Sequence, residues 1–145
     1  MKIDTITQKS PTVVGAYSIS KSAPGLLHKV LTQLKDPALF LSDETPETVT
    51  LLLLANSLKV DLNYLKSGNL PADRWKDVVH SANDLVDTRL LIDAMPGSRE
   101  RISQLINRSI QEHQIRSIIC EQNHLSQDLY DECKLQELFL FVLSE

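Results

Sequence analysis

The sequence predicts an α/β domain of three layers, with about five mostly parallel strands. Two observations favour this class: apolar runs of strand length alternate with helical patterns along the chain, and no internal repeat interrupts the alternation. Strands that are joined through helices form parallel sheets, which helices cover on both faces. The expected strands are residues 12–16, 37–41, 90–92, 115–120 and 138–143.

The length and composition are those of a single globular domain. The chain has 145 residues, of which 42% are hydrophobic and 23% are charged. We expect a flexible N-terminal lead-in over residues 1–11 and one domain over residues 12–145. The formal net charge of -4 argues against a general nucleic-acid-binding surface, so any contact with DNA would need a local basic patch.

The apolar runs and the cysteines predict a cytoplasmic protein that does not enter a membrane. The longest apolar runs, residues 49–55 and 138–143, are far shorter than the roughly 20 residues that a membrane-spanning helix needs. Cys120 and Cys133 have no metal-ligand spacing and follow no secretory signal, so we expect reduced thiols. The four histidines are scattered singly, and we therefore expect no zinc site.

The elements before residue 37 follow from one apolar run and one helical pattern. Residues 12–16 are expected to form a buried strand, and the small, turn-forming residues 17–25 follow it. A helix is expected from about residue 24 to residue 34, because its apolar side chains recur at helical spacing. These side chains are Leu26, Leu27, Val30, Leu31 and Leu34.

The segment that follows is the part of the chain most typical of a functional site. The strand at residues 37–41 ends in the polar turn 42–44, and Thr45 and Pro46 then provide the cap and first position of a buried helix. A shorter helix ends at Gly68, which supplies a left-handed cap. Strand ends that deliver acidic side chains into a loop are where α/β proteins place their chemistry.

The last third of the chain contains the clearest helical pattern. Apolar residues over 75–86 recur at helical spacing, so we expect one face of this helix to pack on the sheet, with Trp75 in the core. Ser98 begins a helix that continues to about residue 113. A final helix is expected over residues 126–134, before the last strand.

Several short motifs occur in a fixed order between residues 38 and 125. They are Leu39-Phe-Leu-Ser42 with Glu44 and Pro46; Ala55 with Ser57, Val60 and Asp61; Ser67-Gly-Asn-Leu70 with Trp75; Leu91-Ile-Asp93; and Ile118-Ile119 ahead of Glu121. This run resembles the ATPase domain of the replicative DNA helicases of the DnaB type. The resemblance implies a RecA-like, P-loop type of fold and a role in DNA replication or its control.

The resemblance also implies site residues. Glu44 matches the catalytic carboxylate of the family, which orients or deprotonates the attacking water, and Glu121 falls where the family has the aspartate that holds Mg²⁺. Residues 15–22 have the register of a phosphate loop, G-x-x-x-x-G-K-[ST]. The implied cofactor-binding residues are Gly15, Ser20, Lys21 and Ser22, and the implied metal ligands are Ser22 and Glu121. The implied cofactors are ATP and Mg²⁺.

The same segment departs from the family pattern in ways that argue against hydrolysis. Ser20 replaces a glycine whose backbone conformation is closed to residues with a Cβ. Pro24 and Gly25 follow Lys21 closely, which should shorten or displace the helix whose N-terminus would face the phosphates. We therefore favour a degenerate domain, not an enzyme, that acts by binding a replicative helicase or by forming a homo-oligomer.

Two other functions remain open. The first is a minimal Mg-ATPase, in which Lys21 and Ser22 bind phosphate and Mg²⁺, Glu121 holds the metal and Glu44 activates water. The second is a nucleic-acid-binding accessory factor that uses a basic surface. The residues of that surface are Lys59, Lys66, Arg74 and Lys76.

Overall fold

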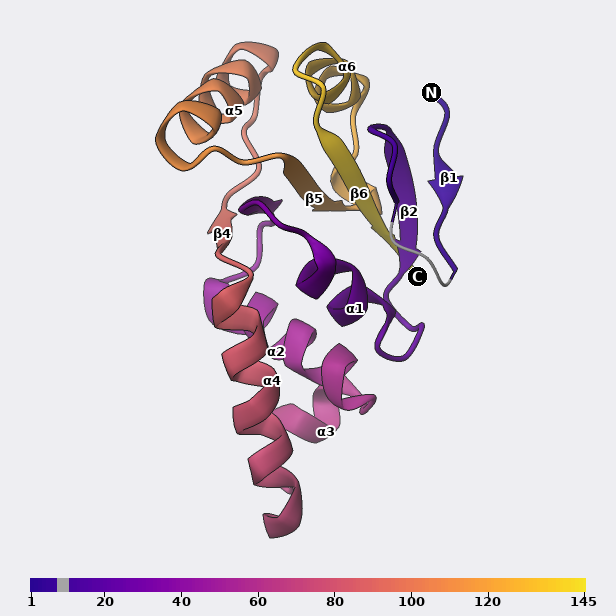
Figure 1. Cartoon of the computed structure of the whole chain (residues 1–145), viewed down its shortest axis with the longest axis vertical. Coiled ribbons are helices and arrows are strands. Elements are labelled where there is room, and N and C mark those ends of the chain that lie inside the picture. Colours follow the sequence, from indigo (N-terminus) through magenta and orange to yellow (C-terminus); the bar gives the residue numbers. More distant parts are fainter. Residues whose placement is uncertain (8–10) are drawn as a thin grey trace.

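A single sheet of six parallel strands lies at the centre of the computed structural model, which describes residues 1–7 and 11–145 (Figure 1). The strands are β1 (Asp4–Thr5), β2 (Ala16–Ser20), β3 (Ala38–Leu41), β4 (Leu90–Asp93), β5 (Ser117–Glu121) and β6 (Phe139–Ser144). Their order in the sheet is β1-β2-β6-β5-β3-β4. All neighbouring pairs are parallel, so the carboxyl ends of the strands share one edge.

Helices cover both faces of the sheet, which confirms the three-layer α/β fold of the RecA-like class. They are α1 (Leu26–Gln33), α2 (Pro46–Leu58), α3 (Leu62–Lys66), α4 (Trp75–Asp87), α5 (Arg99–His113) and α6 (Gln127–Leu135). Helices α5 and α6 lie on one face, α1 and α2 lie on the other, and α3 and α4 lie beyond α2 (Figure 1). Within the described residues, no helix has both the length and the apolar character needed to cross a membrane.

The alternation of side chains along the central strands builds two cores. In β3, Leu39 and Leu41 belong to the core under α5 and α6, whereas Phe40 belongs to the core under α1 and α2. Because both faces of β3 are buried, its sequence is a continuous apolar run and not an alternating one. A third cluster, which includes Leu58 and Leu65, joins α2, α3 and α4 on the side away from the sheet.

The N-terminal strands differ from the expectation. The first long strand is β2 and not residues 12–16, and Val13 and Val14 are exposed. Strand β2 pairs with both β1 and β6. Backbone hydrogen bonds to these neighbours therefore stabilise it as a strand as much as its apolar side chains do. Strand β1 lies inside the expected lead-in, where residues 8–10 are outside the described residues.

Helix α4 also differs from the expectation. It packs on α2 and α1 through one side, which includes Val78 and Leu85. Trp75 was expected in the core, but its side chain is about half exposed, and Val79 and Val86 are exposed as well. The apolar stripe of α4 is therefore wider than the part of it that is buried, because α4 lies on the outer side of α1 and α2 and only one side of it contacts them.

Candidate functional site at the carboxyl edge of the sheet

Four segments that are distant in the sequence meet around one cavity at the carboxyl edge of the sheet. The cavity has a volume of about 200 Å³, and its wall includes Lys21 after β2, Ser42 and Glu44 after β3, and Glu121 at the end of β5. Lys66 of α3 also lines it. The structure therefore brings together three of the residues that the resemblance selects, because parallel strands end at a common edge.

Two carboxylates surround the ammonium group of Lys21. The Nζ atom lies 3.8 Å from Oε1 of Glu121 and 3.2 Å from Oε1 of Glu145. The pair with Glu145 is the weaker constraint, since the Glu145 side chain is fully in solvent. Glu121, which was expected to hold a metal, is only one-fifth exposed and faces a cation of the chain itself. An anionic ligand would have to compete with both carboxylates for Lys21.

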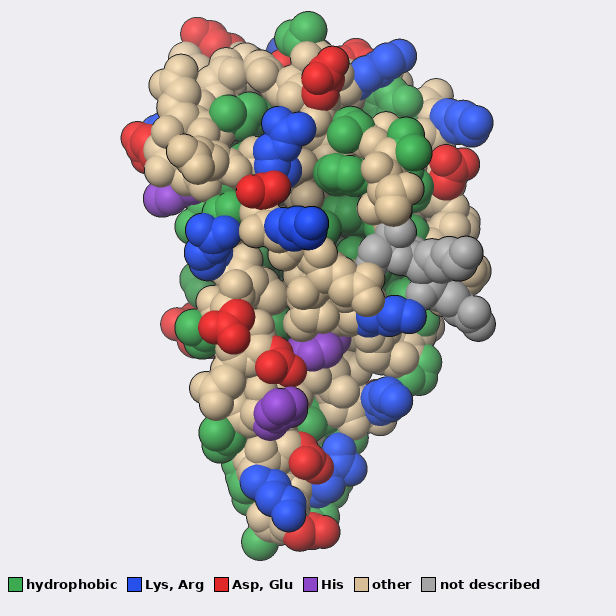
Figure 2. Space-filling view, viewed as in Figure 1, with side chains coloured by type: hydrophobic (Ala, Val, Ile, Leu, Met, Phe, Trp, Pro, Cys, Tyr) green, Lys and Arg blue, Asp and Glu red, His purple; other side chains and the backbone are tan. Residues whose placement is uncertain are grey.

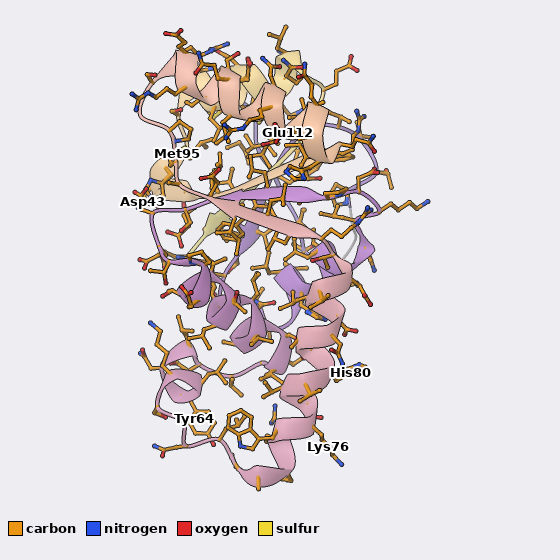
Figure 3. All side chains as sticks on the ribbon, turned by 90° about the vertical axis from the view of Figure 1, so that its left-hand side faces the viewer. Asp43, Tyr64, Lys76, His80, Met95 and Glu112 are labelled. Atoms are coloured by element: carbon orange, nitrogen blue, oxygen red, sulfur yellow. The ribbon has the colours of Figure 1, made fainter. Side chains whose placement is uncertain are left out.

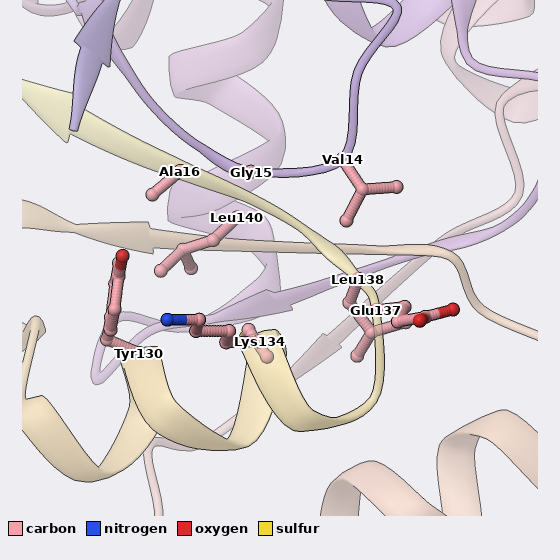
Figure 4. Close-up of a pocket in the computed structure, with 9 residues that line it drawn as sticks. Val14, Gly15, Ala16, Tyr130, Lys134, Glu137, Leu138 and Leu140 are labelled. Atoms are coloured by element: carbon pink, nitrogen blue, oxygen red, sulfur yellow. The ribbon is translucent and has the colours of Figure 1, made fainter. Parts of the chain in front are cut away.

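The position of β2 shows that residues 15–22 do not form the expected phosphate loop. Residues Ala16–Ser20 form the strand itself, so Gly15 lies at its amino end, at the opposite edge of the sheet from Lys21. Gly15 lines a different cavity of about 460 Å³, between the start of β2 and helix α6 (Figure 4). Only Ser20, Lys21 and Ser22 reach the carboxyl edge, and Oγ of Ser20 lies 2.9 Å from Oγ of Ser22.

Five backbone N–H groups after β2 donate to the chain's own acceptors. In a phosphate loop these groups would point at the ligand. Here the five donors and their acceptors are Lys21 to Ser144 O (2.8 Å), Ala23 to Ser20 O (3.2 Å), Gly25 to Asn56 O (3.0 Å), Leu26 to Ala23 O (3.2 Å) and His28 to Asn56 Oδ1 (3.0 Å). Pro24 has no N–H to offer. The segment therefore does not fit the phosphates of a nucleotide.

Asn56 of α2 holds this segment in place. Its side chain is buried, and Nδ2 donates to the carbonyls of Lys21 (3.4 Å) and Ala23 (3.2 Å) while Oδ1 accepts from the N–H of His28. Gly25 takes a left-handed conformation (φ 74°) directly before α1, as only glycine does readily. Asn56 is a site residue that the sequence analysis missed, although its polar side chain directly follows the apolar residues 51–55 of α2.

The loop after β3 is ordered by Ser42. This residue is buried; its N–H donates to the carbonyl of Asp93 (3.0 Å), and its Oγ accepts from the N–H of Glu44 (3.0 Å). Nε2 of His124 lies 3.3 Å from Oδ2 of Asp43, which joins the loops after β5 and β3. The Glu44 carboxylate is thereby placed at the cavity wall with its backbone fixed.

The described residues do not provide a metal centre. No group of three or more His, Cys, Asp or Glu side chains in that part of the chain is arranged to hold a metal ion. Ser22, the second expected metal ligand, is within hydrogen-bond distance of Ser20. Cys120 and Cys133 are buried free thiols, and burial raises the pKa of each to about 12. Neither thiol is available as a thiolate ligand or nucleophile near neutral pH.

Arg74, one of the basic residues expected on a nucleic-acid-binding surface, instead binds other residues of the chain. Nη2 of Arg74 donates to the carbonyl of Leu58 (3.1 Å), and its Nε lies 3.2 Å from Oδ2 of Asp77. Lys66 lines the carboxyl-edge cavity, and Lys59 ends α2 in a left-handed conformation. On the face seen in Figure 2, Lys and Arg side chains alternate with Asp and Glu, so this face has no continuous basic surface.

No protein-family model matches the chain, and no curated protein matches it.

Proposed function

We propose that the protein is a RecA-like domain that does not hydrolyse nucleotide and acts by binding other proteins. The observation that carries the proposal is the set of five N–H groups after β2 that donate to the chain's own acceptors. A nucleotide phosphate would have to break several of these bonds and also displace Glu121 from Lys21. Each broken bond leaves a polar group to be satisfied again, at a cost of about 1–3 kcal/mol where the group is buried.

The proposed partners are a replicative helicase of the DnaB type and further copies of the chain itself. The resemblance over residues 38–125 supports the first partner, since RecA-like domains of these helicases pack against one another in rings. The packing of the sheet between two helical layers supports a rigid binding domain, because Phe40 and Phe141 are fully buried within it. On this proposal the surfaces of the domain carry the function, and the carboxyl-edge cavity does not.

Sedimentation velocity of a purified DnaB-type helicase, with and without the protein, tests this proposal. We expect the protein to co-sediment with the helicase or to change its oligomer, and to change its rate of ATP hydrolysis. An unrelated protein of the same size and net charge is the control. An undisturbed helicase together with a strictly monomeric chain would contradict the proposal.

One observation favours a second candidate, a minimal Mg-ATPase. Lys21, Glu44 and Glu121 line the same cavity, as the resemblance to the helicase ATPase implies. On this alternative the unmutated protein hydrolyses Mg-ATP, and the Lys21→Ala variant does not. If the unmutated protein shows no hydrolysis, the alternative is excluded.

A further inference from the structure

Helix α4 carries an exposed apolar stripe beside the side that packs on the core. Trp75, Val79 and Val86 are 48%, 60% and 75% exposed. At about 100° per residue, these three side chains fall within roughly 40° of one another around the helix. The core-facing side of α4, which includes Val78 and Leu85, borders this stripe.

Two charged side chains flank the stripe on one side. Lys76 and Asp87 follow Trp75 and Val86 directly in the sequence, so each lies about 100° further around the helix than its neighbour. They are about 16 Å apart along the axis, at opposite ends of α4. Neither makes an ion pair with another side chain in the described part of the chain. On the far side of α4, Oδ2 of Asp84 lies 3.5 Å from Nε2 of His28 and 3.7 Å from Nε2 of His80. Figure 3 shows Lys76 and His80 pointing outward from α4.

We propose that this stripe binds the same stripe of a second copy of the chain, with the two α4 helices antiparallel. We place the twofold axis at the level of Ser81 along the helix. Trp75 of each copy then lies at nearly the same level as Val86 of the other copy, with an offset of about 1.5 Å along the helix axis. The same axis brings Lys76 of each copy to the level of Asp87 in the other. Because an antiparallel pair places equivalent flanks side by side, both charges gain a partner of opposite sign.

The order of the charges is the reason for assigning a second copy as the occupant. A positive end and a negative end on the same flank make the stripe complementary to itself when it is reversed. A parallel pair would instead place the two charged flanks on opposite sides of the contact, where neither Lys76 nor Asp87 would gain a partner of opposite sign. The contact is one pair of 13-residue helices, smaller than a standard interface, so we expect a dissociation constant on the order of 10–100 µM.

This inference deepens the proposed function by naming the chain itself as a partner, but it does not depend on the loop after β2. Sedimentation equilibrium on the full chain tests it with two charge reversals, Lys76→Glu and Asp87→Lys. Each variant alone places like charges opposite each other twice, so we expect dimerisation to weaken about tenfold or more. An equimolar mixture of the two variants restores both opposite-charge contacts, and we expect it to dimerise as tightly as the unmutated protein.

Control variants separate this effect from a general change of charge or stability. Lys134→Glu reverses an exposed lysine on α6 and should leave dimerisation unchanged, whereas Val79→Asp should abolish it. Circular dichroism checks that each variant is folded. A monomer at millimolar concentration, or a mixture no tighter than the single variants, would overturn the inference. Nucleotide binding in the same samples would contradict the proposed function instead, and would leave the pairing of α4 intact.

Discussion

Replacing Phe141 with alanine is expected to lower the free energy of unfolding by about 3–5 kcal/mol. Phe141 is fully buried in β6, which lies between β2 and β5 in the sheet. Its ring lies 6.1 Å from that of Phe139 and 6.2 Å from that of Tyr17, and it packs in the core under α1 and α2. The truncation removes these contacts and leaves a cavity in a close-packed interior.

Urea denaturation followed by circular dichroism measures this loss. For a domain of this length we also expect the Tm to fall by about 10–16 °C. Leu135→Ala is the control, because Leu135 is 71% exposed on α6 and its truncation should change stability by less than about 0.5 kcal/mol. A loss below about 1 kcal/mol for Phe141→Ala would show that β6 is not at the centre of the fold.

The second large effect is expected for Asn56→Ala, with a loss of about 2–3 kcal/mol. The variant removes the two donors to the carbonyls of Lys21 and Ala23 and the acceptor for the N–H of His28. The loop after β2 should then open more often, because its backbone is tied to α2 through this side chain. Hydrogen exchange should accordingly be faster at Ala23, Gly25 and His28 than in the unmutated protein.

Two further variants make the test of Asn56 specific. Asn56→Asp keeps the acceptor for His28 but loses the donors, so it should lose part of the stability. Asn63→Ala removes an exposed asparagine side chain on α3, and we expect a change below about 0.5 kcal/mol. Equal unfolding free energies for Asn56→Ala and the unmutated protein would mean that the loop is held by other contacts.

Strong local signals predicted most of the elements. Helix α2 begins at Pro46, as the sequence predicts, and the Thr45 side chain accepts from the N–H of Thr48. Ser98 and Ser126 cap α5 and α6 in the same way, through the N–H groups of Arg101 and Leu129. The buried strands β3 and β5 are apolar on both faces, so their composition alone identifies them.

Features that depend on distant contacts could not be predicted in this way. Strand β2 contains Tyr17, Ser18 and Ser20, whose side chains carry hydroxyl groups. It is stabilised by pairing with β6, which is more than 110 residues away in the sequence. The two apolar sides of α4 are indistinguishable by spacing, and only the packing of α2 shows which one is buried. The site was only partly predicted, although Lys21, Glu44 and Glu121 do line one cavity. Asn56 was missed, and Lys66 was expected only as part of a basic surface.

The measurement that tests the central claim most directly is a calorimetric titration of the unmutated protein and Lys21→Ala with Mg-ATP and Mg-ADP. Because five N–H groups after β2 are bonded within the chain and Lys21 faces two carboxylates, we expect no binding at millimolar nucleotide for either protein. Micromolar binding that is lost in Lys21→Ala would contradict the account, because residues 20–22 would then hold phosphate despite these contacts.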